Sequence, residues 1–170
     1  MASNSEAVLS TPTTEETRTG TDLIFLSSTG VRSMARTIQE KSQPLNDLSK
    51  NVRNDLILAI RSETAANIKS VYSPLDGFYA LTLPTIKAVY CFDTKAALQD
   101  GSLRVTIWDT IQPKSFLKLS DGTIYLGKEG YLGTYTGYTD NGNTYRFQYF
   151  TNHNDLGQPN LTSILKRLKV

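Results

Sequence analysis

The sequence predicts a mainly β, antiparallel fold with propeller-like blades and one amphipathic helix. Two observations support this fold class. Short runs rich in Val, Ile, Thr and aromatic residues recur from residue 68 onward, and such residues suit the half-buried surface of a sheet. Asp-Gly and Asn-Gly pairs separate several of the runs, among them Asp121-Gly122, which is expected to form a two-residue loop. These pairs tolerate the positive φ of tight hairpin turns.

The runs are expected to form strands that are grouped into blades. The expected strands cover residues 23–26, 31–38, 68–72, 78–83, 88–92, 103–108, 116–119, 123–126, 131–135, 144–150 and 164–170. Two groups of about four strands, near 68–108 and 116–151, repeat at roughly the 45-residue period of a propeller blade. Two blades cannot close a ring, since closed propellers have at least about four. The propeller is therefore incomplete, and its open edges need other copies or partners to cover them.

One helix is expected near residues 50–62. Its apolar residues recur at the spacing of one helical face; they are Val52, Leu56, Ala59 and Ile60. Ser49 or Asp47 is expected to cap its first turn, because a short polar side chain accepts a bond from an unpaired backbone N–H. The apolar stripe should pack against a sheet.

The chain divides into a predicted flexible polar arm, residues 1–21, and a β-rich domain, residues 22–170. The arm is rich in Ser, Thr and Glu, and its small apolar cluster at residues 7–9 is too small to offset the entropy of ordering it alone. No stretch approaches the ~20 apolar residues that span a bilayer, so no membrane anchor is expected.

The charge balance argues against nucleic-acid binding as the main task. The net charge is +2, from 18 basic and 16 acidic residues, whereas domains that neutralise phosphates usually carry a large basic excess. At the C-terminus, Lys166, Arg167 and Lys169 are expected to form the solvated basic face of a strand. The alternative is a positive lining that makes weak, non-specific contact with nucleic acid.

The residues that carry chemistry do not form a recognisable site. Cys91 lies in an apolar run and is expected to be a small buried hydrophobe. His153, the single histidine, lies in a polar loop and is expected to be solvated. Residues 140–143 resemble the start of a calcium loop, but its twelfth position would be Thr151, so a hairpin turn is favoured.

Carboxylates near strand ends are the remaining catalytic candidates. Asp93, Asp109 and Glu129 lie at such positions, and nothing in their spacing singles out a pair for glycoside cleavage. We therefore predict that the protein is not an enzyme and has no catalytic, cofactor-binding or metal-binding residues.

Tyrosines are concentrated in one region of the chain: Tyr125, Tyr131, Tyr135, Tyr138, Tyr145 and Tyr149. Cross-strand packing and a protein interface are the favoured interpretations, because aromatic residues stabilise sheets and offer rigid contact area with a polar tip. A sugar-binding surface is the alternative.

Segments distributed along the chain occur in a characteristic order: 22–33, 47–52, 68–74, 89–93, 104–108, 137–142 and 156–160. Taken together, they resemble the C-terminal portion of the tail-hub, or nozzle, proteins of short-tailed bacteriophages. This family is also described as packaged-DNA stabilisation proteins, and its members are usually several times longer.

The resemblance implies a β-propeller-like fold and a homo-oligomeric ring below the portal and adaptor proteins of a virion tail. Such a ring would line the DNA-exit channel, help to retain packaged DNA and carry tail fibres or spikes. On this basis we expect a virion structural protein of the tail or neck, made in the host cytoplasm. The alternative is a carbohydrate-binding, host-recognition module of a virion. The family has no catalytic residues to transfer.

Overall fold

The computed structural model describes residues 7–9, 22–39, 47–140 and 142–148. This part of the chain is mainly β and contains three antiparallel sheets. The N-terminal sheet consists of β1 (Ala7–Leu9), β2 (Asp22–Ser27) and β3 (Gly30–Ser33). The central sheet consists of β4 (Lys69–Ser73), β5 (Phe78–Leu83), β6 (Ala88–Ala97) and β7 (Leu103–Trp108). The C-terminal sheet consists of β8 (Ser115–Lys118), β9 (Ile124–Lys128) and β10 (Tyr131–Thr134).

Two helices accompany the sheets in the described residues. They are α1 (Met34–Gln39), directly after β3, and α2 (Arg53–Arg61), which leads to the central sheet. Single 3₁₀ turns flank α2 on either side, at η1 (Lys50–Val52) and η2 (Ala65–Asn67).

The central sheet is covered on both faces. One core cluster joins it to the N-terminal sheet and α2; its buried members are Ile24, Leu26, Val31, Leu48, Leu56, Ala59, Ile68, Tyr72, Tyr79, Leu81, Leu83, Tyr90, Phe92 and Leu103. The other cluster joins it to the C-terminal sheet; its buried members are Val71, Phe78, Ala80, Val89, Cys91, Ile124 and Leu126. Because successive side chains of a strand point to opposite faces, β5 supplies both clusters and is buried along its whole length.

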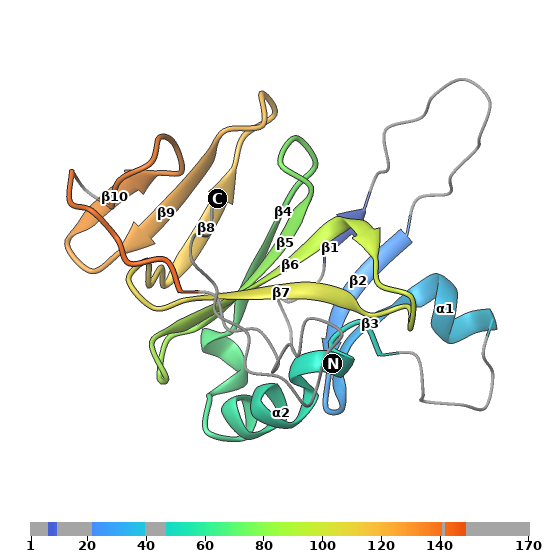
Figure 1. Cartoon of the computed structure of the whole chain (residues 1–170). Coiled ribbons are helices and arrows are strands. Elements are labelled where there is room, and N and C mark those ends of the chain that lie inside the picture. The colour runs from blue at the N-terminus through green and yellow to red at the C-terminus, as the bar shows by residue number, and fades with distance from the viewer. Residues whose placement is uncertain (1–6, 10–21, 40–46, 141, 149–170) are drawn as a thin grey trace, which may run out of the picture.

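The three sheets follow one another across the molecule in chain order (Figure 1). Within each sheet, neighbouring strands are also consecutive in the chain. The first strands of the sheets lie side by side, since β1 contacts β4 and β4 contacts β8. The three first strands therefore lie next to one another, with β4 between β1 and β8.

Most of the predicted strands are confirmed within one or two residues at their ends. The strands at 78–83 and 103–108 match β5 and β7 at both ends, whereas β6 is longer than predicted because it contains a bulge between Phe92 and Ala97. The loop at Asp121-Gly122 is one residue longer than predicted, since the amide of Leu119 donates to the carbonyl of Thr123 at 2.9 Å. Gly122 takes the positive φ of +91° that this three-residue loop requires.

The strand predicted at 31–38 is wrong beyond Ser33, where the chain turns into α1. The carboxylate of Asp22, on the neighbouring strand, explains the change. It accepts hydrogen bonds from the Ser33 hydroxyl and, at 2.9 Å, from the backbone amide of Ala35. A carboxylate that accepts a bond from the first turn stabilises a helix start, and this contact is not local in sequence.

The helix predicted at 50–62 is confirmed as η1 followed by α2, with its predicted apolar stripe packed in the core. Ser49 stands at the N-cap but makes no side-chain cap, and the Asp47 carboxylate accepts from the amide of Ser49 at 3.1 Å, before the first helical residue. The Ser49 hydroxyl instead accepts a bond from the amide of Val31 at 3.0 Å and donates to Asp47 at 2.8 Å. Leu48 between them bridges two sheets: its amide donates to Val31 and its carbonyl accepts from the amide of Leu103.

The predicted arm at 1–21 requires a correction at three residues. Residues 7–9 form β1, which pairs antiparallel with β2 from Ala7 opposite Ile24 to Leu9 opposite Asp22. This small apolar cluster is ordered by pairing with another part of the chain. The other residues of the arm, and the strand predicted at 164–170, lie outside the described residues.

Candidate interaction surface

Three aromatic rings meet where the C-terminal sheet packs on the central sheet. Tyr135, directly after β10, stacks on Trp108 with ring centroids 6.0 Å apart and 8° between the planes. It also packs against Phe78 in a T-shaped arrangement at 5.4 Å, and Phe78 and Trp108 are 5.8 Å apart. The amide of Tyr135 donates to the carbonyl of Ile124 at 2.8 Å, which fixes the backbone under the ring. We call Phe78, Trp108 and Tyr135 the aromatic anchor.

The anchor holds the tyrosine in its neutral form. Burial raises the pKa of Tyr135 above its ordinary value, and the carboxylate of Asp76 adds to the effect. The side chain is still 36% exposed. Tyr135 therefore packs its ring against the other two aromatic side chains while part of the residue remains exposed.

The chain that follows the anchor is an exposed segment rich in aromatic residues. We call residues 136–140 and 142–148 the aromatic segment; Figure 1 shows it, in orange and red, after β10. Tyr138 is 89% exposed, Phe147 72% and Tyr145 52%, and Arg146 is exposed beside them. Tyr, Phe and Arg are enriched at the centres of protein interfaces, and exposed apolar patches mark interaction sites. The aromatic segment therefore has the composition and the exposure of a binding surface.

The strand predicted at 144–150 is wrong for the residues that the structure describes. Residues 144–148 are exposed and belong to no strand, and 149 and 150 lie outside the described residues. The alternation of Tyr145 and Phe147 with polar residues is typical of a strand. A strand also needs a partner that bonds to its N–H and C=O groups, and the described strands pair with one another instead.

Two other tyrosines of the cluster lie on the C-terminal sheet. Tyr125 is half-buried on β9, opposite Leu117 and Thr134. Tyr131 lies at the start of β10 with the ammonium of Lys128 5.6 Å from its ring centroid. Tyr149 lies outside the described residues. Some tyrosines of the sequence cluster therefore pack in the molecule and others are exposed. Trp108, which the sequence did not single out, packs against Tyr135.

Two of the carboxylates considered for catalysis, Asp93 and Asp109, lie apart from each other. Asp93 follows the buried part of β6, and Asp109 follows Trp108, which pairs with Val89. Five residues of strand therefore separate the two carboxylates, roughly 16 Å at ~3.3 Å per residue. Glycosidases hold their carboxylates about 5–10 Å apart. Asp93 and Asp109 are not placed as such a pair.

Glu129 is paired with a lysine. It lies in the turn between β9 and β10, where the ammonium of Lys114 is 2.8 Å from its carboxylate. Hydrogen bonding to Lys114 lowers the pKa of Glu129, so it stays ionised at neutral pH. A general acid needs a raised pKa, which is the opposite shift.

The other candidates for chemistry are structural residues or lie outside the described residues. Cys91 is buried, as predicted, and burial followed by the charge of Asp93 raises its pKa to about 12. Asp140 and Asn143 exchange two backbone hydrogen bonds of 2.9 Å, which agrees with the hairpin turn favoured for this segment. His153, the three basic residues near the C-terminus and Thr151 are outside the described residues. Among the residues that are described, no group of three or more His, Cys, Asp and Glu is placed to hold a metal ion.

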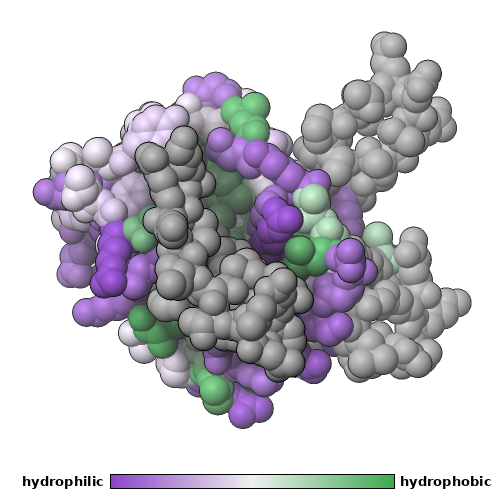
Figure 2. Space-filling view, viewed as in Figure 1, coloured by the Kyte–Doolittle hydropathy of each residue, from purple (hydrophilic) through white to green (hydrophobic). Residues whose placement is uncertain are grey.

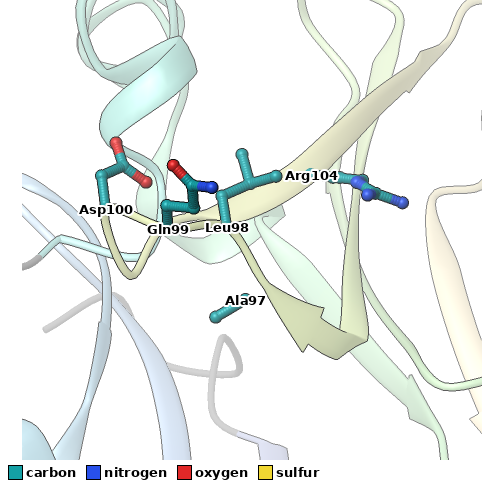
Figure 3. Close-up of a pocket in the computed structure, with 5 residues that line it drawn as sticks. All are labelled: Ala97, Leu98, Gln99, Asp100 and Arg104. Carbon is teal, nitrogen blue, oxygen red and sulfur yellow. The ribbon is translucent and has the colours of Figure 1, made fainter.

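An open depression of about 530 Å³ lies at the β6–β7 hairpin. It is lined by Ala97, Leu98, Gln99, Asp100 and Arg104, and Figure 3 shows the Arg104 side chain pointing away from Asp100. Hydrogen bonds from Ser102, followed by Lys50, lower the pKa of Asp100. Ligand sites are built from polar groups that converge. These groups diverge or are already paired, so we assign no ligand to the depression.

On the face in Figure 2, outside the grey atoms, apolar side chains form separate small patches among hydrophilic ones. No described helix is both long and apolar enough to cross a membrane. No protein-family model, curated protein or solved structure matches the chain.

Proposed function

We propose that this protein is a bacteriophage virion structural protein of the tail hub or nozzle, with a propeller-like fold that is completed by assembly. The observation that carries the proposal is the arrangement of the three sheets. They are consecutive antiparallel meanders, packed face to face, and their first strands β1, β4 and β8 lie side by side. Propeller blades are four-stranded antiparallel sheets around a central channel; the central sheet has four strands and the other two have three.

The resemblance supports the same function. Two of the segments that carry it, 89–93 and 104–108, lie on the paired strands β6 and β7 of the central sheet. The three described sheets are too few to close a propeller. In the proposed function, copies of the chain form a ring in the virion tail that lines the DNA-exit channel and helps to retain packaged DNA.

The aromatic segment is the proposed contact surface of this ring. Exposed Tyr138, Tyr145 and Phe147 offer rigid contact area without a large entropic cost. Their partners would be neighbouring copies, the portal or adaptor protein, or a tail fibre or spike protein. The net charge of +2 suits a channel wall that DNA slides past, because strong phosphate binding would oppose its movement.

Assembly is tested by measuring the mass of the purified full chain, alone and mixed with the portal and adaptor proteins of the same virus. We expect a defined oligomer or complex. Replacing Tyr138, Tyr145 and Phe147 by serine should dissociate it, because the interface centre is removed. The matched control replaces Leu58 and Leu75, which are 63% and 75% exposed elsewhere, and should leave the mass unchanged. A wild-type chain that stays monomeric with every partner would refute the proposal.

A carbohydrate-binding module is the second candidate, and the exposed rings of Tyr138 and Tyr145 favour it. Sugars bind through the faces of exposed aromatic rings, whose apolar area is joined to a polar tip. A glycan array decides between the two functions. Sugar binding that is lost in Tyr138→Ala and kept in Tyr131→Ala would favour this candidate, while absence of binding to any glycan would exclude it.

A further inference from the structure

Strand β7 forms an open edge of the central sheet. The strand order is β4-β5-β6-β7, so within the described residues β7 pairs with a neighbour on one side only; Figure 1 shows it in yellow. Arg104, Thr106 and Ile107 are exposed, Ile107 by 51%. Natural proteins usually protect such an edge with proline, lysine or a bulge. Residues 105–108 contain neither of these residue types and pair regularly with β6.

The backbone of β7 shows which of its polar groups point away from β6. The amide of Leu103 donates to the carbonyl of Leu48 at 2.9 Å, and the carbonyl of Leu103 accepts from the side-chain amide of Asn51 at 3.4 Å. Both partners lie outside the sheet. The N–H and C=O groups of a strand alternate in direction from one residue to the next. Val105 and Ile107 therefore point their N–H and C=O groups outward, as Leu103 does.

The pairing of β6 leads to the same result. The amide of Thr94 donates to the carbonyl of Gly77, directly before β5, at 2.8 Å. The even-numbered residues in this part of β6 therefore bond toward β5 and the odd-numbered ones toward β7. Cys91 lies opposite Thr106, so Thr106 bonds to β6 and its two neighbours on β7 do not. No described residue bonds to the outward groups of these neighbours, and such groups are a template for another strand.

We propose that β7 pairs antiparallel with β7 of a second copy of the chain, across a twofold axis that passes beside Thr106. The two central sheets then become one continuous sheet. In this register Val105 lies opposite Ile107 of the second copy, and the two residues exchange both of their backbone hydrogen bonds. The outward N–H and C=O groups of both residues are satisfied in both copies.

The side chains of the two strands match in this register. On the face of Trp108, which packs toward the C-terminal sheet, Arg104 lies opposite Trp108 of the second copy, and a guanidinium can stack on an indole ring. Thr106 lies opposite Thr106 of the second copy, and Val105 meets Ile107 on the other face. Aromatic, β-branched and Thr–Thr pairs stabilise antiparallel sheets. This register places no like charges opposite each other, so the edge is complementary to itself, as a twofold contact requires.

The neighbouring twofold registers leave outward groups without partners. A shift in one direction places Val105 opposite its own copy and Ile107 opposite Leu103, whose outward N–H and C=O groups are already bonded. A shift in the other direction places Ile107 opposite its own copy and Val105 opposite Asp109, which lies beyond the end of β7. The register centred on Thr106 is therefore favoured.

The aromatic segment begins beside the same edge. Tyr135 stacks on Trp108, the last residue of β7, and the segment follows Tyr135 directly. A twofold contact joins two copies and closes on itself, so a larger ring needs a second contact, which is the role proposed for the aromatic segment. The β7 contact goes beyond the proposed function, because it needs neither a viral partner nor a ring.

The mass of the free full-length chain tests the dimer. The starting protein has serine at Tyr138, Tyr145 and Phe147, which removes the proposed ring contact, and sedimentation velocity should give about twice the 18.9 kDa of one chain. Adding Thr106→Lys should give a monomer, because two like charges then face each other at the axis. Thr106→Glu should do the same, and an equimolar mixture of the two variants should restore the dimer. The matched control is Thr110→Lys, an exposed position just beyond β7, which should stay dimeric.

Three outcomes of this experiment would overturn the proposal. They are a starting protein that is monomeric, a dimer that Thr106→Lys leaves intact, and a mixture of the Lys and Glu variants that stays monomeric. Far-ultraviolet circular dichroism of each variant verifies that the chain is folded. A dimer without a ring, or a ring without this dimer, separates the present contact from the proposed function.

A disulfide across the axis tests the register. Opposite residues that exchange no backbone bonds have Cα atoms about 4.5 Å apart, within the range of a disulfide. Thr106→Cys is made in a Cys91→Ala background, because Cys91 lies opposite Thr106 in the same chain. Oxidised glutathione should link most of this variant into dimers and none of the control Thr110→Cys. Equal linking of the two variants, or none, would contradict the register.

Amide hydrogen exchange shows what covers the edge. In the dimer the amides of Val105 and Ile107 should exchange slowly, and Thr106→Lys should make both exchange fast. The amide of Trp108 faces β6 and should stay slow in both proteins. Slow exchange of Val105 and Ile107 in a monomeric Thr106→Lys chain would show that another part of the same chain covers the edge, and the proposal would then be wrong.

Discussion

Replacing Tyr135 by leucine tests whether the aromatic anchor stabilises the packing of the C-terminal sheet. The substitution keeps most of the apolar volume and removes one ring from two aromatic pairs, with Trp108 at 6.0 Å and with Phe78 at 5.4 Å. Each such pair contributes about 0.5–1.5 kcal/mol beyond area burial, so the two contribute about 1–3 kcal/mol. Because the ring is 36% exposed, we expect a loss in the lower half of this range, about 1–2 kcal/mol.

The assay is urea-induced unfolding of the wild type, Tyr135→Leu and Tyr138→Leu, followed by far-ultraviolet circular dichroism. Tyr138 is 89% exposed, so its substitution should change the free energy of unfolding by less than ~0.5 kcal/mol. The emission of Trp108, the single tryptophan, should shift to longer wavelength only when its stacking partner Tyr135 is replaced. Equal stability of the two variants, or a tryptophan shift in both, would refute the reasoning.

Two further predictions concern the interior. Gly30 has φ +135°, and a Cβ there would collide with the carboxylate of Asp47, so Gly30→Ala should lower the free energy of unfolding by more than ~2 kcal/mol. Gly130→Ala, at φ +82° with open space around it, should cost only ~1 kcal/mol; equal thermal shifts would contradict the collision. Burial, followed by the charge of Asp93, raises the pKa of Cys91 from 9.0 to about 12, so iodoacetamide should label this thiol only in urea. The folded chain then holds more protons than the unfolded chain between about pH 9 and 12, so stability should fall as pH rises through this window, less steeply in Cys91→Ala.

The central sheet could be predicted because each of its strands is signalled locally. The run at 78–83 is apolar or aromatic apart from Thr82 and follows the turn residues Asp76-Gly77, so its ends coincide with those of β5. The helix could be predicted for the same reason, since its stripe is periodic. The functional proposal depends on the resemblance of several sequence segments, in their order along the chain, to a protein family. No local pattern of residues predicts that function.

Contacts between distant residues could not be predicted. Asp22 starts α1 from the neighbouring strand, and Ser49 bonds to β3 instead of capping the helix next to it. The aromatic anchor unites residues 78, 108 and 135, whose spacing in the sequence carries no signal. The Tyr cluster was visible in the sequence, but which of its members pack and which are exposed depends on these distant partners.

The position of Leu48 has a consequence for how the molecule opens. Its amide and carbonyl bond to Val31 of β3 and Leu103 of β7, so the N-terminal and central sheets are joined through one backbone unit. Between the central sheet and the segment before β8, the Thr82 hydroxyl donates a side-chain hydrogen bond to the carbonyl of Pro113 at 2.6 Å. Local unfolding proceeds in cooperative units defined by such bonds. The N-terminal and central sheets should thus open as one cooperative unit, which a backbone hydrogen bond at Leu48 joins directly.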